Sequence, residues 1–244
     1  MLSLPGRLLL LVAMLVLATP ASAACSEETF EDNDYTICRF DLRQDHLRLY
    51  NISPEGEPYG SFSALERQLA AEGKSLVFAM NAGMYDEALK PIGLYVEQGR
   101  QLKKLNRRDG PGNFHLKPNG VFFIKGDSGG VMESEAYAKS GRKPDYASQS
   151  GPMLVVDGAI HPKFSEDGTS RQRRNGVGQV DEHTLVFAIS DSYVNFHSFA
   201  RLFRNRLGCR NALFLDGSIS SLHAAELGRS DGFLPLGPMV ALVK

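Results

Sequence analysis

The sequence has 244 residues, of which 43% are hydrophobic and 23% are charged, and its net charge at neutral pH is −1. This composition is typical of a globular protein with a substantial core and excludes a disordered or fibrous chain. The near-neutral charge predicts neither a nucleic-acid partner nor binding to an anionic membrane surface. No linker divides the chain, so we expect a single domain.

The first 23 residues have the features of a secretory signal peptide. Arg7 supplies a positive charge, residues 8–17 form an apolar core, and residues 21–23 give an A-x-A cleavage signal. We expect cleavage after Ala23 or Ala24 and a mature domain that spans residues 24–244. The protein is then exported to the periplasm or the extracellular space, with no stable membrane insertion after cleavage.

Export to an oxidising compartment changes how the three cysteines are interpreted. Cys25 and Cys38 lie close together in the sequence, and a disulfide between them would tether the new amino terminus to the first strand. Cys209 is then a buried, inert thiol. Lipidation of Cys25 is an alternative, which Ser22 disfavours because a lipobox usually has an aliphatic residue there.

Strands alternate with loops in the first part of the mature chain. Residues 39–43 and 46–50 alternate polar and apolar side chains, which predicts two strands with one solvated face. Ser63-x-x-Glu66 predicts a capping box that opens a helix ending at Gly73. Residues 75–80 then form a continuous apolar strand that ends at Asn81.

The middle of the chain contains further strands and long loops. Residues 92–96 and 121–124 are apolar runs of strand length, and residues 106–120 form a polar loop rich in Gly and Pro. Residues 128–145 predict a surface excursion with a short helix at most. Residues 149–158 predict a turn, a strand and a second turn.

The segment from residue 185 to residue 216 predicts a strand, a helix and a second strand. The apolar run 185–189 ends at Asp191, the residues between a possible Asn195 cap and Gly208 have helical spacing, and 212–215 is a second buried strand that ends at Asp216. Such short connections predict a right-handed βαβ crossover between parallel strands. Asp191 and Asp216 then leave the sheet at the same edge, where open α/β sheets bind ligands.

A basic run precedes this segment. Residues 170–178 lead into a strand that we expect to form a hairpin with residues 185–189. Alternation along a strand must point one of Arg173 and Arg174 inward, which makes a ligand role plausible for that side chain. In all, the patterns predict eight or nine strands and two helices, and hence an α+β fold, or an α/β fold, with a mixed sheet in one domain.

Polar residues at the ends of strands offer the chemistry of a ligand site. Arginine binds phosphate through two prongs, while carboxylate and amide groups contact hydroxyls or act at an anomeric carbon. This combination suits a sugar joined to a phosphate. The histidines show no metal-ligand spacing, so we expect neither a metal nor another cofactor. The candidate residues are Asn81, Gln149, Arg174, Asp191, Asp216, Ser218 and Ser221.

Six motifs occur in order along the chain: NAGMY (81–85), PIGLYVEQG (91–99), QSGPMLVVDG (149–158), RNGVG (174–178), FARLFRNRLGC (199–209) and ALFLDGSISSL (212–222). In this order they resemble the phosphodiester glycosidase family. The resemblance covers nearly the whole mature chain, and LDGSIS is its strongest block. The chain has Ser218-Ile219 where eukaryotic members usually carry Gly-Gly, and NAG where they have NGG, so it resembles the compact exported bacterial branch.

The resemblance implies hydrolysis of a bond between an anomeric carbon and a phosphodiester. The substrate would be a sugar phosphate or a cell-envelope glycan. A phosphate monoester is a weakly basic leaving group, so one carboxylate and one cationic clamp suffice, unlike the two carboxyl groups of ordinary glycosidases. We predict Asp216 as that carboxylate and Arg174 as that clamp, with Asp191 and Glu97 as alternative carboxylates. Substrate would be bound by Asn81, Gln149, Ser218, Asp191 and Ser221.

Two other functions are compatible with the same residues. A binder of envelope glycophosphate polymers would use the same polar cleft without turnover. A phosphodiesterase that cuts P–O bonds would usually need a metal cluster that the sequence does not suggest.

Overall fold

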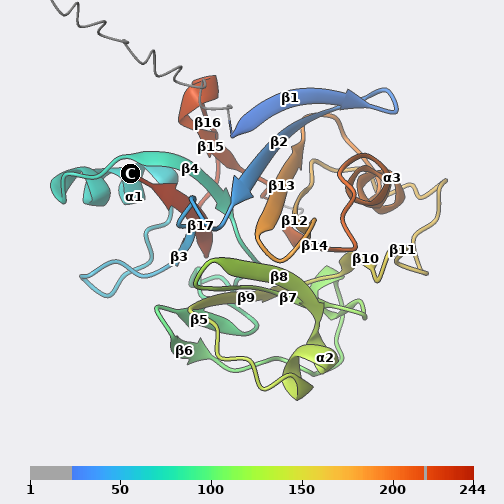
Figure 1. Cartoon of the computed structure of the whole chain (residues 1–244), viewed down its shortest axis with the longest axis horizontal. Coiled ribbons are helices and arrows are strands. Elements are labelled where there is room, and N and C mark those ends of the chain that lie inside the picture. Colours follow the sequence, from blue (N-terminus) through green and yellow to red (C-terminus); the bar gives the residue numbers. More distant parts are fainter. Residues whose placement is uncertain (1–23, 217–218) are drawn as a thin grey trace, which may run out of the picture.

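The computed structural model describes residues 24–216 and 219–244. In this part of the chain, three β-sheets pack around a common core, and an α-helix covers the outer face of each sheet (Figure 1). In Figure 1 the third sheet lies below the other two. All the strand pairs in these sheets are antiparallel.

The first sheet has seven strands in the order β1-β2-β13-β12-β14-β10-β11. Its members, in chain order, are β1 (Cys25–Phe30), β2 (Asn33–Asp41), β10 (Met153–Val156), β11 (Ala159–Ile160), β12 (Asn175–Gln179), β13 (Thr184–Ser190) and β14 (Asn211–Asp216).

The other two sheets have five strands each, in the orders β16-β15-β4-β17-β3 and β6-β5-β9-β7-β8. The second sheet consists of β3 (Arg48–Tyr50), β4 (Leu76–Asn81), β15 (Leu222–Ala224), β16 (Arg229–Ser230) and β17 (Met239–Val243). The third consists of β5 (Tyr95–Glu97), β6 (Arg100–Lys103), β7 (Gly120–Lys125), β8 (Ser128–Glu133) and β9 (Tyr146–Ser150).

The central core joins all three sheets through aromatic side chains. The ring of Phe187 on β13 lies 5.4 Å from the ring of Phe78 on β4 and 5.7 Å from that of Phe122 on β7, measured between centroids. Successive residues of β13 point alternately into this core and toward α3, so both faces of the strand are buried. This explains why residues 185–189 form a continuous apolar run.

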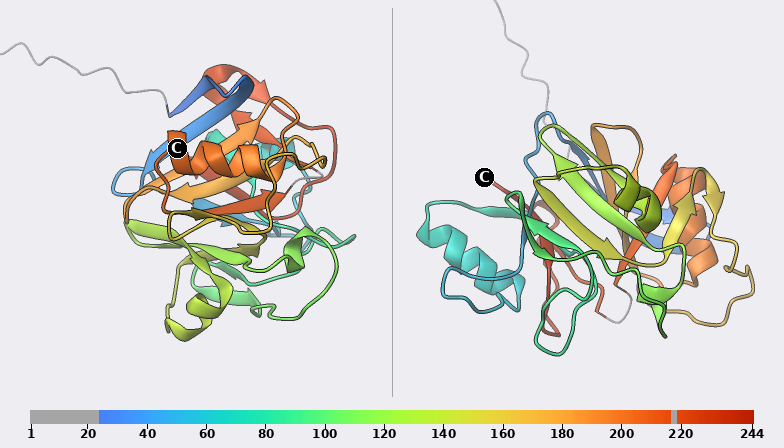
Figure 2. Two further views of the ribbon diagram at one scale, coloured as in Figure 1. Left: turned by 90° about the vertical axis from the view of Figure 1, so that its right-hand side faces the viewer. Right: turned by 90° about the horizontal axis from the view of Figure 1, so that it is seen from below.

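The helices close the outer faces of the sheets. α1 (Phe62–Ala71) buries Leu65 and Leu69 against the second sheet, α2 (Ser134–Lys139) covers the third, and α3 (Phe196–Arg201) covers the first. Figure 2 shows α3 in front of the first sheet and far from α1. The shorter helical turns are η1 (Asn113–His115), the π-helical η2 (Leu202–Arg206) and η3 (Ala225–Leu227).

The predicted βαβ unit forms in a modified arrangement. β13 and β14 run in the same direction, but β12 lies between them and pairs antiparallel with both. The predicted mixed sheet is therefore wrong, and so is the α/β alternative, because the described sheets contain no parallel pair. The molecule is mainly β with few helices, which is compatible with α+β, and Asp191 and Asp216 do leave the sheet at the same edge.

The described part of the chain has more strands than the eight or nine predicted, and the predicted strand at 92–96 covers only Tyr95–Glu97 as β5. Two further local predictions were wrong. α1 begins after Ser61, whose hydroxyl accepts a hydrogen bond from the Ala64 N–H at 3.1 Å, and not at Ser63. Residues 128–133 were predicted to be part of a surface excursion, but they form β8. The chain turns back tightly after β7, and the two strands pair as a hairpin. The predicted Asn195 cap is confirmed: its side chain accepts from the Ser198 N–H at 2.8 Å.

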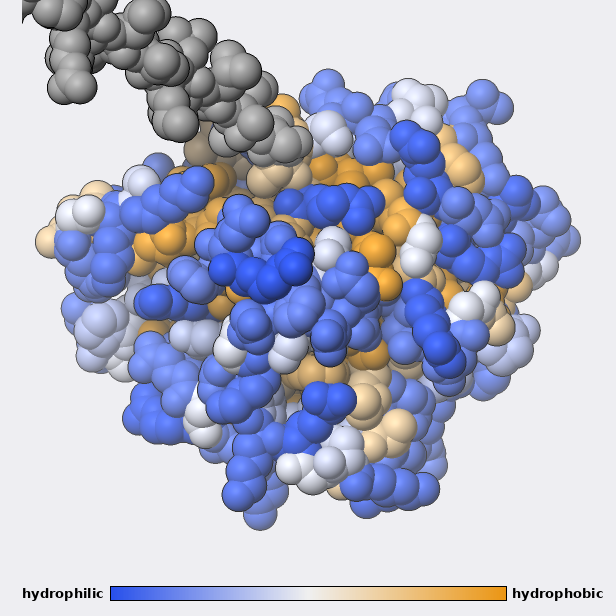
Figure 3. All heavy atoms as spheres, viewed as in Figure 1, coloured by the Kyte–Doolittle hydropathy of each residue, from blue (hydrophilic) through white to orange (hydrophobic). Residues whose placement is uncertain are grey.

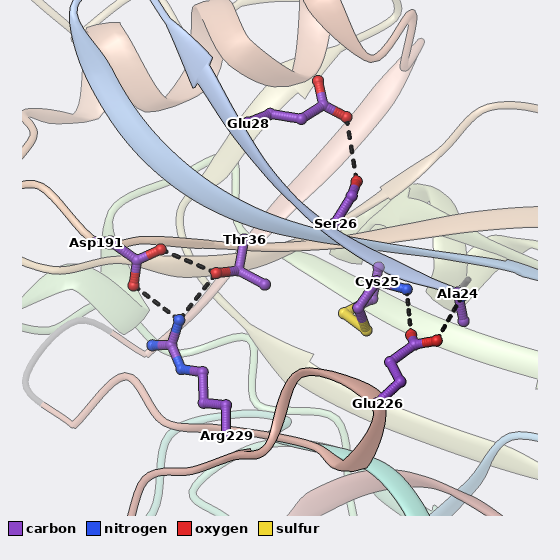
Figure 4. Close-up of a disulfide and its surroundings, with 9 residues drawn as sticks. Ala24, Cys25, Ser26, Glu28, Thr36, Asp191, Glu226 and Arg229 are labelled. Atoms are coloured by element: carbon purple, nitrogen blue, oxygen red, sulfur yellow. Dashed lines mark hydrogen bonds and ion pairs between the residues drawn. A yellow bond between two sulfur atoms is a disulfide. The ribbon is translucent and has the colours of Figure 1, made fainter.

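The amino-terminal disulfide is confirmed. Cys25 and Cys38 are bonded, and Cys209 is a buried free thiol whose pKa is raised by burial to about 12. Next to the disulfide, the two carboxylate oxygens of Glu226 accept hydrogen bonds from the N–H groups of Ala24 at 3.2 Å and Cys25 at 2.5 Å (Figure 4). The start of β1 is thus held by both a covalent and a polar contact.

Removal of this disulfide is expected to lower the free energy of unfolding by about 2–4 kcal/mol, because the bond chiefly restricts the unfolded chain. The test is denaturant unfolding of the Cys25→Ser/Cys38→Ser variant. Cys209→Ala is the control, since its thiol is unpaired, and it should leave the pairing of Cys25 with Cys38 unchanged in peptide mass mapping. A bridge that includes Cys209 would contradict the prediction.

The surface is mostly polar. Figure 3 shows one face on which hydrophilic residues predominate and hydrophobic residues are visible between them. A helix with the length and apolar character needed to cross a bilayer does not occur in the described part of the chain.

Candidate active site

Three strands bring polar side chains together where the first and second sheets meet. Asn81 ends β4, Asn175 begins β12 and Asp216 ends β14. The Asn175 Nδ2 group donates to Oδ1 of Asn81 at 2.8 Å and to its main-chain oxygen at 2.9 Å. The Asp216 N–H donates to Oδ1 of Asn175 at 2.9 Å. Asn175 therefore fixes the strand end that carries Asp216 relative to the second sheet.

Ser220 and Ser221 are held by the same network. The Ser220 hydroxyl donates to the main-chain oxygen of Asp216 at 2.7 Å, and the Ser221 N–H donates to Oδ1 of Asn81 at 2.9 Å. Predicted site residues Asn81, Asp216 and Ser221 are thus neighbours. Ser218, another predicted residue, lies outside the described residues.

A β-bulge lies immediately before Asp216. The pairing of β12 with β14 shifts in register between Asn175 and Gly176, so that Leu215 is an extra residue on β14. Such a bulge bends the strand and re-aims the side chain that follows it, and bulges are common beside active sites. Asp216 is only 7% exposed. The bulge and the Asn175 contact together fix the backbone that carries its carboxylate.

Asn81 has a buried donor that no group within residues 24–216 and 219–244 satisfies. Its Oδ1 accepts two hydrogen bonds, whereas its Nδ2 has no partner in those residues although Asn81 is fully buried. A buried unsatisfied donor costs about 1–3 kcal/mol and is rare in native proteins. A hydroxyl or phosphate oxygen of a ligand would satisfy this group.

Tyr85 lies next to the Asp216 charge. Its hydroxyl donates to the main-chain oxygen of Pro235 at 2.7 Å, and a Cβ atom at Gly237 would collide with its ring. Burial, and then the negative charge of Asp216, raise the pKa of Tyr85 above its usual value. Tyr85 therefore stays protonated at physiological pH and holds the loop after β4 against the loop before β17.

Arg174 is the inward-pointing member of the arginine pair, and Arg173 is exposed. Its Nε donates to the main-chain oxygen of Val194 at 2.9 Å and its Nη2 to that of Ser170 at 2.8 Å. The guanidinium carbon lies 3.7 Å from the centroid of the Phe196 ring. Burial lowers the pKa of Arg174 to about 10, so that it keeps its charge at neutral pH.

This buried cation has no carboxylate partner among the described residues. The ion pairs of the chain within 24–216 and 219–244 do not include Arg174, and its third nitrogen, Nη1, has no hydrogen-bond partner in that part of the chain. A buried charge is costly unless it is paired. The arrangement favours a small anion at this place.

The predicted site residue Gln149 is fully engaged in contacts within the protein. The side chain of Gln149 accepts from the N–H groups of Leu94 and Asn106 and donates to Asn106 and Ser134, at 2.8–3.1 Å, and thereby holds the 106–120 loop on β9. These four bonds use the full capacity of its amide.

Asp191 is bound by Arg229 and Thr36. Its carboxylate accepts from Nη1 of Arg229 at 2.8 Å and from the Thr36 hydroxyl at 2.9 Å, as Figure 4 shows. Glu97, the other alternative carboxylate, accepts from the Tyr95 hydroxyl at 3.0 Å on β5. Burial raises the pKa of Glu97. No hydrogen bond connects Asp191 or Glu97 with Asn81, Asn175 or Asp216 among the described residues.

Sequence reasoning missed Asn175 and Tyr85. Both lie inside motifs that the sequence singled out, RNGVG and NAGMY. Their roles depend on contacts between strands that are distant in the sequence, so periodicity carries no signal for them. In the described part of the chain, no group of three or more His, Cys, Asp or Glu side chains is arranged to hold a metal ion.

Comparison with known proteins identifies related chains. Residues 74–232 match the phosphodiester glycosidase family. The chain is 35% identical over 219 residues to the uncharacterized protein YigE of Escherichia coli K12, and the match covers 89% of this chain and 84% of that protein.

Two solved structures share the fold. The catalytic domain of zebrafish N-acetylglucosamine-1-phosphodiester alpha-N-acetylglucosaminidase, auto-inhibited by its pro-peptide, has a TM-score of 0.59 at 15% identity, and the match covers 89% of this chain and 81% of that one. A hypothetical protein from Synechocystis has a TM-score of 0.53 at 12% identity, over 90% of this chain and 61% of that one.

Proposed function

The chain belongs to the phosphodiester glycosidase family, and from this premise we propose that it is an exported hydrolase that releases a sugar from a glycosyl-1-phosphodiester. The observation that carries the proposal is the position of Asp216. Its carboxylate stands at the end of a buried strand, after a bulge, at a strand end that Asn175 holds and beside a buried donor on Asn81.

The proposed reaction breaks the bond between the anomeric carbon and the phosphate oxygen. A water oxygen forms the new bond to the anomeric carbon, and the electron pair of the broken bond leaves with the phosphate oxygen. The products are a free sugar and a phosphate monoester, and one proton of the water goes to the monoester or to solvent. The negative charge of Asp216 stabilises the positive charge that grows at the anomeric carbon in the transition state.

Arg174 would neutralise the phosphate group. The guanidinium is held in place by Val194 and Ser170, and its charge is retained at neutral pH. A preorganised cation of this kind needs no rearrangement when charge develops on the leaving group. Asn81 would donate its unsatisfied Nδ2 proton to a substrate oxygen. Gln149 would act through the loop that it holds, and Asp191 through Arg229.

The cleavage that accompanies the proposed export would turn the contact between Ala24 and Glu226 into an ion pair. Cleavage after Ala23 would convert the Ala24 N–H into a charged amino group beside the Glu226 carboxylate, at the 3.2 Å contact already present. The disulfide uses the Cys25 thiol that lipidation would require. The expected result is a mature protein whose sequence begins ACSEE, read by amino-terminal sequencing of protein recovered from outside the cytoplasm; a start at Cys25 would refute the ion pair.

Incubation with an α-glycosyl-1-phosphodiester in ¹⁸O-labelled water tests the proposed reaction. Cleavage at the anomeric carbon places the label in the sugar, as mass spectrometry would detect. Label in the phosphate would identify a phosphodiesterase instead. Saturable binding without any released sugar would identify a glycophosphate binder and contradict the proposed hydrolysis.

A further inference from the structure

Two cavities adjoin strand β6, which lies at the free edge of the third sheet (Figure 1). Their volumes are about 530 and 630 Å³, within the range of roughly 300–1,000 Å³ that is usual for ligand pockets. Leu102 and Lys103 line both cavities, so the two are neighbours. We call the lining the β6 surface; it consists of residues 51–53, 90–92, 95, 97, 100 and 102–108.

The β6 surface is strongly basic, although the chain as a whole has a net charge of −1. Among the described residues that line the two cavities, Glu97 is the only acidic one. Arg107 is also the only lining cation that forms an ion pair within 24–216 and 219–244, and its partner is Glu135. The lining cations are Lys90, Arg100, Lys103, Lys104, Arg107 and Arg108.

A purely structural role explains only part of this charge. Lysine on an edge strand discourages pairing with a second chain, and Lys103 at the end of β6 fits that role. Lys90 and Arg108 lie in loops outside β6, where no strand edge needs protection, and yet both are exposed and line the cavities. The concentration of unpaired cations around two cavities therefore favours an anionic ligand.

The β6 surface also offers a hydrogen-bond acceptor. Asn51 lines the cavity of about 530 Å³ and is 2% exposed, and its Oδ1 has no hydrogen-bond partner in the described part of the chain. A buried acceptor without a partner is rare in native proteins. A hydroxyl group satisfies such an acceptor, whereas a phosphate oxygen does not.

Two other kinds of anionic partner fit this surface less well. A segment that enters a membrane interface carries several exposed apolar side chains, and Leu102 is the only large one among the described residues here. Single-stranded nucleic acid is bound by stacking of its bases on exposed aromatic rings. The aromatic residue of the lining, Tyr95, is 1% exposed.

The loop between β4 and β5 joins the β6 surface to the candidate active site. Tyr85, which lies next to the Asp216 charge, pairs with Pro91, which lines one cavity. The N–H of Ile92, which lines the other, donates to the main-chain oxygen of Met84 at 3.2 Å. One loop therefore contributes both to the candidate site and to the walls of the two cavities.

We propose that the β6 surface binds an extended polyanionic chain, in which units that carry hydroxyl groups are joined by phosphodiesters. Several phosphates of one chain contact its cations, and a hydroxyl reaches Asn51. Such binding needs no turnover. Only the further step, that the bound chain is a substrate whose glycosyl phosphate end reacts at Asp216, rests on the proposed function.

The binding test uses poly(glycerol phosphate), with glycerophosphoglycerol as the single phosphodiester for comparison. The native protein should bind the polymer at least about 10-fold more tightly, because several phosphates of one chain are contacted together. Lys103→Gln/Lys104→Gln should weaken polymer binding by roughly 10-fold at low salt and make its salt dependence less steep, because two phosphate contacts are lost. Lys139→Gln/Lys143→Gln is the matched control, since these exposed lysines line neither cavity and carry the same charge.

The other outcomes are equally decisive. Equal affinities for polymer and single diester, or an equal loss in the control variant, would refute the binding surface. Lysine-dependent binding to phosphatidylglycerol vesicles without polymer binding would identify a lipid surface instead and overturn the proposal.

Turnover separates this inference from the proposed function. On a small glycosyl-1-phosphodiester, Lys103→Gln/Lys104→Gln should keep kcat/KM within about twofold of the native value, whereas on a poly(glycerol phosphate) that carries a terminal glycosyl phosphate it should lose roughly 10-fold. Equal effects on both would refute the assignment of the bound chain as substrate. If the native protein hydrolyses neither, the proposed function fails, and the binding measurement alone decides whether the β6 surface holds a polyanion.

Discussion

Replacement of Asp216 by Asn is expected to reduce kcat by about 10²-fold or more while the protein folds normally, since this is the scale of a missing catalytic or charge-stabilising group. The amide keeps the size of the side chain and removes its charge. The contacts that fix the strand end, to Asn175 and Ser220, are made by main-chain atoms of residue 216 and are retained in the variant. The measurement is kcat on a glycosyl-1-phosphodiester, with the melting temperature followed in parallel.

Glu97→Gln is the matched control for this variant. Glu97 is a half-buried carboxylate bonded to Tyr95 in the third sheet, away from the Asn81–Asn175–Asp216 network. Its replacement should leave kcat within about twofold of the native value. If Asp216→Asn is folded and retains near-native turnover, Asp216 is not the catalytic carboxylate, and Asp191→Asn becomes the next variant to measure.

The parts of the fold that follow from local pattern were predictable from the sequence. Residues 185–189 and 212–215 are apolar because both faces of their strands are buried. The helical segment between them, α3 followed by η2, is capped by Asn195 and ends shortly before Gly208, which has a left-handed φ of +69°. The disulfide followed from export and from the short distance in sequence between Cys25 and Cys38. Each of these inferences needs only neighbouring residues.

Strand order was not predictable in the same way. A strand–helix–strand segment predicts that two strands run in the same direction, and β13 and β14 do so. Nothing local states that β12, which precedes both in the sequence, lies between them. The insertion of β12 replaces a parallel β13–β14 pair by two antiparallel pairs, and it also places Asn175 directly beside Asp216.

The residues of the candidate site were predictable from the sequence only where a local pattern marks them. Asn81 and Asp216 were identified because each follows a buried strand, and the structure places them in one hydrogen-bond network. Alternation along a strand predicted that one of Arg173 and Arg174 points inward, and Arg174 is the buried member of the pair. The bulge at Leu215 and the bridging role of Asn175 arise from pairing between distant segments, so a single sequence does not contain a local signal for them.

Arg174→Lys is the second variant with a large expected effect, a loss of kcat/KM of about 10- to 100-fold. The planar guanidinium of Arg174 donates to the main-chain oxygens of Val194 and Ser170 and has a further nitrogen for a phosphate. The single ammonium group of a lysine does not make all of these contacts at once. Loss of a donor to these buried carbonyl oxygens is expected to reduce the free energy of unfolding by about 1–3 kcal/mol. The variant is thus expected to be less active and less stable, so turnover alone does not separate an anion-binding role from a structural one.

Binding of inorganic phosphate distinguishes an anion-binding role of Arg174 from a structural one. If Arg174 is the phosphate clamp, phosphate should raise the melting temperature of the native protein, because a ligand that binds only the folded state stabilises it. This increase should be lost in Arg174→Lys and retained in Arg201→Lys, a control in which the arginine is paired with Glu31 on the outer surface of α3. An increase of the same size in Arg174→Lys would mean that the buried guanidinium only supports the loops around it, and that the phosphate is held by another residue.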